Sequence, residues 1–146
     1  LFDVGCRKDG YCADMTRTFF YKKVPSEKHR AIYETVRRAN AAAEAILKPG
    51  VPLCEVDKAA RQIIEDAGYG PNFTHRLGHF IGLEVHEYGD VSSANTKVAE
   101  VGNIFSIEPG IYVEGEVGVR IEDLVLITED GCEILNSFSK ELDIVE

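Results

Sequence analysis

The sequence has no apolar run that approaches the ~20 residues needed for a helix that spans a bilayer. It has fewer basic residues than acidic ones, 16 against 25, which gives a formal net charge of -9. A charge balance of this sign disfavours binding to nucleic acid or to an anionic membrane surface. We therefore expect neither a nucleic acid nor a membrane as a partner.

The chain also has no C-x-x-C pair, so a zinc ribbon or a thioredoxin-type redox site is not expected. Two disulfides fit the cysteine count, but four free thiols in a cytoplasmic protein are the expected state. The cysteines are Cys6, Cys12, Cys54 and Cys132.

A chain of 146 residues, 45% of them hydrophobic, is most simply one domain;. Its length allows roughly 68–70% of the unfolded surface to be buried. The chain starts with Leu1, inside what reads as a strand. We therefore expect residues 1–146 to be a piece of a longer protein.

Residues 1–22 predict a β-hairpin. Asp9-Gly10 is a strong signal for a two-residue turn between two segments rich in β-branched and aromatic residues;. In that register residue 3 faces residue 16, and Asp14 becomes a diagonal neighbour of Asp3 on one sheet face. A longer loop with a bulge would change this parity.

Two helices and a set of strands follow. Apolar residues at steps of three and four predict helices over 26–48 and 54–67, each with one apolar stripe that packs against a sheet. Residues 69–99 are irregular and rich in glycine, and residues 101–145 return to strands, with a hairpin turned at Asp130-Gly131;. This order predicts an α+β fold, with the helices on one face of a mostly antiparallel sheet. The first stripe is Ile32, Val36, Ala39, Ala43 and Ile46, and the second is Val56, Ala59, Ala60, Ile63, Ile64 and Ala67.

Five side chains have the chemistry of ligands for a pair of metal ions. Four carboxylates in one low-dielectric site would repel one another strongly, and two divalent cations would cancel their charge. If the five converge, they indicate a dinuclear metal centre and hydrolysis by a metal-activated water. They are Asp3, Asp14, His79, Glu108 and Glu122.

Each of these residues also has a simpler explanation. Asp3 and Asp14, taken alone, are typical of a solvated hairpin face. Glu108 and Glu122 lie in apolar strands, where a carboxylate needs a partner. For Glu122 that partner is equally well Arg120, two residues away, in an ordinary ion pair.

The segment HRLGHFIGLEVHE places three histidines within twelve positions: His75, His79 and His86. A single histidine is more often a hydrogen-bonded structural residue than a metal ligand. Three close together make a functional site about as probable as a structural role.

Four segments together resemble the signature blocks of the pita-bread metallopeptidases, a family that includes Xaa-Pro dipeptidases (prolidases), Xaa-Pro aminopeptidases and methionine aminopeptidases. They occur in the family's order and cover most of the chain. The resemblance implies a partial copy of the pita-bread fold, namely the C-terminal part of a catalytic domain without its N-terminal domain. The segments are DVGCRKDGYCADMTRTF, HRLGHFIGLEVHE, IFSIEPGIYV and GVRIEDLVLIT.

The resemblance also implies a role for each ligand. Asp3 would hold one metal ion, and His79 and Glu108 the other. Asp14 and Glu122 would bridge both. The implied ions are two divalent metals, with manganese favoured by the oxygen-rich ligand set and cobalt, iron or zinc as alternatives.

Further residues match positions around the reacting bond. Glu108 resembles the general base that takes a proton from the hydroxide or water between the metals. His86 resembles a histidine near the scissile bond, and Arg120 a site arginine beside the bridging glutamate. His75 and Tyr112 match residues placed around the substrate and the metals.

The motif VRIED resembles the Xaa-Pro enzymes rather than the methionine aminopeptidases. The implied function is hydrolysis of an Xaa-Pro bond in a peptide with proline at its second position, with a homodimer as an assembly left open. An inactive pita-bread binding module, a methionine aminopeptidase-type exopeptidase and a relative that cleaves another C–N bond are the alternatives. One departure is Phe80, where the family often has glycine, which is expected to narrow or reshape the pocket beside His79.

Overall fold

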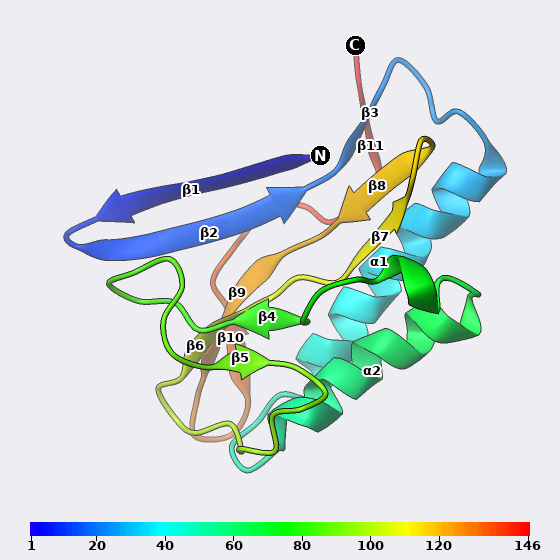
Figure 1. Ribbon diagram of the computed structural model, residues 1–146. Coiled ribbons are helices and arrows are strands. Elements are labelled where there is room, and N and C mark those ends of the chain that lie inside the picture. Colours follow the sequence, from blue (N-terminus) through cyan, green and yellow to red (C-terminus); the bar gives the residue numbers. More distant parts are fainter.

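The computed structural model describes residues 1–146, which form two helices packed against a set of short strands. Figure 1 shows α1 and α2 side by side on one side of the strands, with the hairpin of β1 and β2 projecting at the opposite side. The α+β architecture is as predicted. The elements are β1 (Phe2–Lys8), β2 (Tyr11–Arg17), β3 (Phe19–Tyr21), α1 (Glu27–Ile46), α2 (Leu53–Asp66), the 3-10 helix η1 (Gly70–Asn72), β4 (Gly78–His79), β5 (Asp90–Val91), β6 (Ile104–Ile107), β7 (Gly110–Val113), β8 (Val117–Arg120), β9 (Asp123–Ile127), β10 (Cys132–Ile134) and β11 (Asp143–Val145).

The N-terminal hairpin has the predicted register. Lys8 pairs with Tyr11 across a two-residue turn, and Asp3 faces Thr16. Asp9 and Gly10 have φ values of 52° and 92°. Two positive φ values are what a type I′ turn requires, and this turn matches the twist of the strands. The predicted parity therefore holds, and it puts Asp3 and Asp14 on the same face.

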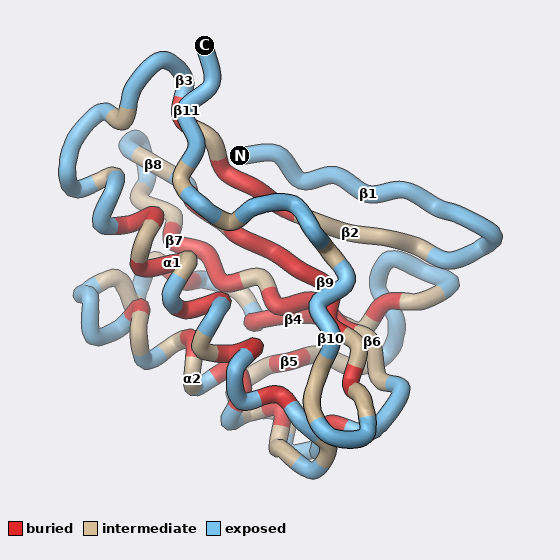
Figure 2. Tube along the Cα trace, turned by 180° about the vertical axis from the view of Figure 1, so that it is seen from behind, coloured by how far each residue is buried: buried red, intermediate tan, exposed pale blue.

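Both predicted helices form within one or two residues of the expected bounds, and most of each stripe faces the strands. Figure 2 shows the buried side of α1 and α2 turned inward. Ile46 and Ala67, each the last member of its stripe, are exposed because they lie at or beyond the helix ends. The core residues from these helices are Ile32, Val36, Ala39, Ala43, Val56, Ala60 and Ile64.

The strands are mostly antiparallel, as predicted. β9 lies between β6 and β10, and β7 pairs with β8. Isolated bridges from Thr16 to Glu122 and from Phe80 to Phe105 connect β2 and β4 to this central group. The parallel pairing of β3 with β11 joins segments more than a hundred residues apart and has no signal in the local pattern.

The four cysteines are free thiols in this fold, as expected. Neither helix combines the length and the apolar character that crossing a membrane would require.

Candidate metal centre

All five candidate ligands line one cavity of about 590 Å³ beneath the N-terminal hairpin. Three further candidates, His75, His86 and Arg120, line the same cavity. Tyr112 lies just behind the wall, where its hydroxyl is 3.0 Å from His75 Nε2 and 3.3 Å from Arg120 Nη1. The structure therefore brings together every residue that the sequence singled out.

His79 occupies the centre of the group. Its backbone N–H donates to Ser106 Oγ at 2.9 Å, and its ring Nδ1 lies 3.1 Å from the carbonyl oxygen of Phe80. A carbonyl only accepts, so Nδ1 carries a proton, and Nε2 is the ring nitrogen that can present a lone pair. This second contact is the usual way in which a protein orients a histidine that binds a metal.

Three carboxylates face that lone pair. His79 Nε2 is 3.7 Å from Asp14 Oδ2, 3.6 Å from Glu108 Oε1 and 3.9 Å from Glu122 Oε1. One ligand atom from each of Asp14, His79 and Glu122 lies within 4.8 Å of the other two. A lone pair surrounded by carboxylate oxygens is unfavourable unless a cation or protons lie between them.

The electrostatics of the carboxylates agree with this picture. Burial raises the pKa of Glu122 to about 8, and the charges of Glu108 and Asp14 add to the rise. Burial also raises the pKa of Glu108, and burial together with the charge of Asp3 raises that of Asp14. The site thus crowds carboxyl groups together so that their ionised forms are disfavoured without a cation, and this donor set fits hard divalent cations.

Asp3 sits at the rim of the group. Its side chain is 52% exposed and forms an ion pair with Arg120 Nη2. Arg120 therefore pairs with Asp3, and the alternative ion pair between Arg120 and Glu122 does not form. Asp3 still lies close enough for its charge to act on the pKa of Asp14.

Glu122 is 2% exposed and is held by its neighbours on β2. Thr16 Oγ1 donates to Glu122 Oε2 at 2.5 Å and accepts from Arg120 Nε at 3.0 Å. The Thr16 hydroxyl thus ties the buried carboxylate to the arginine that pairs with Asp3.

A buried arginine fixes the backbone behind this carboxylate. Arg17 Nη1 donates to the carbonyl oxygens of Thr16 at 2.9 Å and Glu122 at 2.7 Å, and Nη2 donates to Asp123 Oδ1 at 2.7 Å. Asp123 Oδ2 has no geometrically good hydrogen bond, but the Lys140 ammonium lies 2.7 Å away and balances its charge. These paired charges keep β2 in register with the start of β9 at the site.

The loop that carries His86 is fixed by a hydrogen bond between two of its own residues. Glu87 Oε1 accepts from the N–H of Leu83 at 2.8 Å, which closes the segment that presents His86. The His86 ring then lies edge-on to His79, with 4.3 Å between the ring centroids. His86 therefore faces the same cavity as the carboxylates.

Three residues of the site had no place in the sequence-based set: Thr16, Arg17 and Ser106. Thr16 faces Asp3 in the predicted hairpin, and Ser106 shares a predicted strand face with Glu108. Strand parity therefore gave a usable signal for both. Arg17 acts through contacts with backbone carbonyls and with the Asp123 carboxylate, and no sequence motif indicates such contacts.

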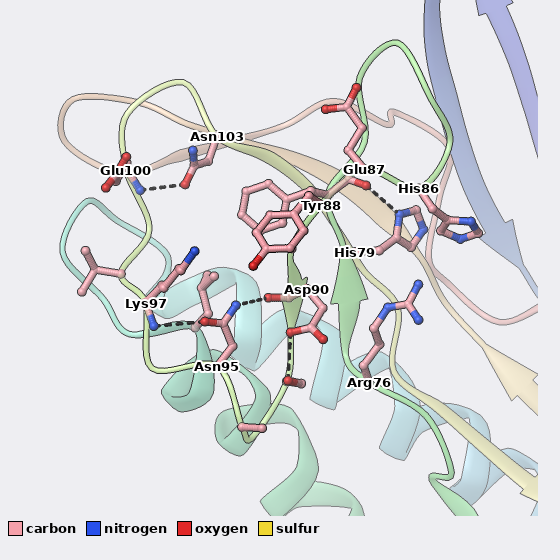
Figure 3. Close-up of a pocket in the computed structure, with 16 residues that line it drawn as sticks. Arg76, His79, His86, Glu87, Tyr88, Asp90, Asn95, Lys97, Glu100 and Asn103 are labelled. Atoms are coloured by element: carbon pink, nitrogen blue, oxygen red, sulfur yellow. Dashed lines mark hydrogen bonds between the residues drawn. The ribbon is translucent and has the colours of Figure 1, made fainter.

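Phe80 lies beside His79 but outside the lining of the metal cavity. Its ring packs on Phe105, with centroids 5.3 Å apart, and approaches Gly89. It forms a wall of a second cavity of about 980 Å³ beside the first. Figure 3 shows this second cavity, and His79 and His86 line both cavities.

Comparisons with known proteins identify the family. Residues 1–129 match the sequence profile of metallopeptidase family M24. The chain is 53% identical over 140 residues to an uncharacterized peptidase, SH1217, of Staphylococcus haemolyticus, covering 96% of this chain and 40% of that protein.

Solved structures are similar over nearly the whole chain. Prolidase from Pyrococcus furiosus superposes with a TM-score of 0.91 at 44% identity, covering 94% of this chain and 40% of its own. The X-Pro aminopeptidase of Thermotoga maritima superposes with a TM-score of 0.93 at 40% identity, covering 98% of this chain and 40% of its own. These neighbours confirm the predicted pita-bread fold, and the chain spans about 40% of the length of the relatives it matches.

Proposed function

This chain belongs to metallopeptidase family M24, and we propose that it is the C-terminal part of a catalytic domain that hydrolyses Xaa-Pro peptide bonds. The Xaa-Pro assignment draws on the VRIED segment, which here gives Arg120 and Glu122 adjoining roles in one cavity. The relatives named as prolidase and X-Pro aminopeptidase support the same class of substrate.

The residues that would hold two divalent ions, manganese by preference, are those that meet around His79. Asp14, Glu108 and Glu122 supply oxygen ligands beside His79 Nε2, and Asp3 would complete the set from the rim. When bound, such ions polarise the substrate carbonyl and lower the pKa of water. The convergence of three carboxyl groups on His79 Nε2 is the single observation that carries this assignment.

Glu108 is the proposed general base. Ser106 Oγ donates to Glu108 Oε1 at 3.1 Å and orients the carboxylate. Burial raises its pKa, which makes it a better proton acceptor than an exposed glutamate;. Glu108 would take a proton from the attacking water as the C–O bond forms. The proton then passes to the proline nitrogen, which has no N–H of its own, as the C–N bond breaks.

The remaining residues would orient the substrate and stabilise developing charge. His86 lies beside His79 and would donate a hydrogen bond to the carbonyl oxygen as it becomes negative;. The hydrogen-bonded row of His75, Tyr112 and Arg120 would position the peptide along the cavity wall.

The test is peptide cleavage by the full-length protein after chelation and after restoring manganese, cobalt, iron or zinc. We expect turnover of Ala-Pro but not Ala-Ala, and only with metal restored. The variant Glu108→Gln, assayed with its metal content measured and restored to that of wild type, should lose at least about a hundredfold in kcat. Cleavage of Met-Ala-Ser in place of Ala-Pro would instead indicate a methionine aminopeptidase-type enzyme. Two bound metals without any cleavage would indicate an inactive binding module.

A further inference from the structure

Glu108 and Glu122 lie in a gap between two β-ladders. The ladder of β6 and β9 ends at the pair of Ile107 and Asp123, and β7 and β8 pair only beyond the two glutamates. Sheet pairing therefore does not fix the separation of the two glutamates. Their carboxylates nevertheless meet at His79 Nε2, at 3.6 and 3.9 Å.

The residue next to each glutamate is held from the far side of the strands, where α1 packs (Figure 1). Successive side chains of a strand point to opposite faces, so these neighbours point away from the metal cavity. Before Glu108, the carbonyl oxygen of Ile107 accepts from Nδ2 of Asn40, a fully buried residue of α1, at 3.0 Å. After Glu122, the side chain of Asp123 is completely buried.

One ammonium group joins these two attachments. Lys140 Nζ donates to Asn40 Oδ1 at 2.7 Å and lies 2.7 Å from Asp123 Oδ2. It also donates to both carboxylate oxygens of Glu44, each at 2.7 Å. A continuous set of contacts therefore runs from the backbone before one glutamate to the side chain after the other.

The segment that carries this ammonium, between β10 and β11, is itself fixed. Arg17 Nε donates to the carbonyl oxygen of Ser139 at 3.0 Å, and Arg17 Nη2 donates to that of Phe138 at 2.7 Å. The Tyr33 hydroxyl donates to the carbonyl oxygen of Lys140 at 3.2 Å. Because its backbone is anchored, the lysine can hold its partners at set distances.

Charge balance alone does not require this lysine. The buried cluster contains two cations, Arg17 and Lys140, and two carboxylates, Glu44 and Asp123. Neutral side chains in place of one such pair would keep the balance, and replacements of this kind often cost no stability. What Lys140 alone supplies is the link between Asn40 and Asp123.

We propose that Lys140 is a positioning residue, which sets the separation of Glu108 and Glu122 for one of the two metal ions. That ion is the one beside His79, because both glutamates approach Nε2 of this ring. The other ion, toward Asp3, has ligands on the hairpin and depends less on the lysine. This inference rests on the proposed function, in which these residues hold two ions.

The test is binding of Mn²⁺ to the full-length protein, measured by calorimetry and by the electron paramagnetic resonance signal of two coupled Mn²⁺ ions. Lys140→Met alone would leave two buried carboxylates with one cation and would lose stability. The decisive variant is therefore Lys140→Met/Glu44→Gln, which removes one charge of each sign. We expect its urea midpoint to stay near that of wild type, its affinity for the second ion to fall at least about tenfold, and its first ion to bind within about threefold of wild type. The coupled signal should weaken accordingly.

Two single variants complete the set. Glu44→Gln is the matched control, because it keeps the link through Lys140 and should bind both ions as wild type does. Asn40→Leu cuts the same link without removing a charge, and it should weaken the second ion selectively, again about tenfold.

Recovery of second-ion affinity in the double variant would show that Lys140 only balances charge, and it would overturn the proposal. Unchanged affinity in Asn40→Leu, or an equal loss for both ions, would overturn it as well. A wild type that binds two ions and does not cleave Ala-Pro would refute the proposed peptidase function, while the binding data would still decide on Lys140.

Discussion

At the scale of single residues, the site depends on small side chains that orient large charged ones. Thr16 is the clearest case, because one hydroxyl donates to Glu122 and accepts from Arg120. A buried carboxylate that loses such a donor is left partly unsatisfied. Ligand geometry is therefore set by residues that would never touch a metal ion.

We expect Thr16→Val to weaken metal binding about 10- to 100-fold, because residues that support a ligand typically contribute this much to metal affinity. Valine keeps the shape of threonine but removes the hydroxyl, whereas Thr16→Ser keeps the hydroxyl and should bind metal nearly as wild type does. The measurement is competition for Mn²⁺ with a chelator of known affinity. Equal affinity in both variants would show that the hydroxyl does not position Glu122.

Single residues also show how much of the site the sequence predicts. Charge balance and strand parity grouped Asp14 with Asp3, and the histidine-rich segment indicated His79. The pairing of Arg120 was not predictable, since its choice of Asp3 over Glu122 depends on side-chain rotamers and on a hairpin 117 positions away.

At the scale of elements, the sequence predicts those helices and hairpins that a local residue pattern specifies. Helix periodicity and the Asp9-Gly10 turn gave α1, α2 and the first hairpin almost to the residue. The strands β4 and β5 have two residues each, which is too short for any periodicity to be seen. They depend instead on the close approach of backbones, which glycine allows.

Gly78 shows this dependence. A Cβ atom built on it would lie 1.8 Å from the carbonyl oxygen of Ser106, a distance that no side chain tolerates. We expect Gly78→Ala to push β4 from β6, to lower the free energy of unfolding by about 3 kcal/mol and to weaken metal binding by moving His79. Urea unfolding and metal titration measure the two effects.

The matched control is Gly131→Ala in the loop between β9 and β10. Nothing lies within 4 Å of a Cβ built there, so stability should change by less than about 0.5 kcal/mol;. If Gly78→Ala and the control had the same free energy of unfolding, β4 could move away from β6 without loss of stability. The packing of β4 on β6 would then not be what positions His79.

At the scale of the whole molecule, the net charge of -9 is partly concentrated in the metal cavity. Without metal, the raised pKa of Glu122, about 8 against the ordinary 4.5, means that the folded protein holds a proton that the unfolded chain releases. Glu108 and Asp14 act in the same direction. Protonation of these carboxyls is thus linked both to folding and to metal binding.

In the protein stripped of metal by a chelator, the contribution of Glu122 to the free energy of unfolding should be highest at and below about pH 4.5. It should fall as the pH rises toward and through about 8, because a raised folded pKa gives stability below the unfolded pKa and loses it above the folded one;. Binding of divalent metal should remove this fall, since the cations favour the ionised carboxylates, and at pH 7 it should release about one proton or more. Urea unfolding from pH 5 to 9 with and without Mn²⁺, and calorimetry in buffers of different ionisation enthalpy, measure both effects. A pH slope unchanged by metal, or binding without proton release, would mean that Glu122 does not titrate with the metal and is not one of its ligands.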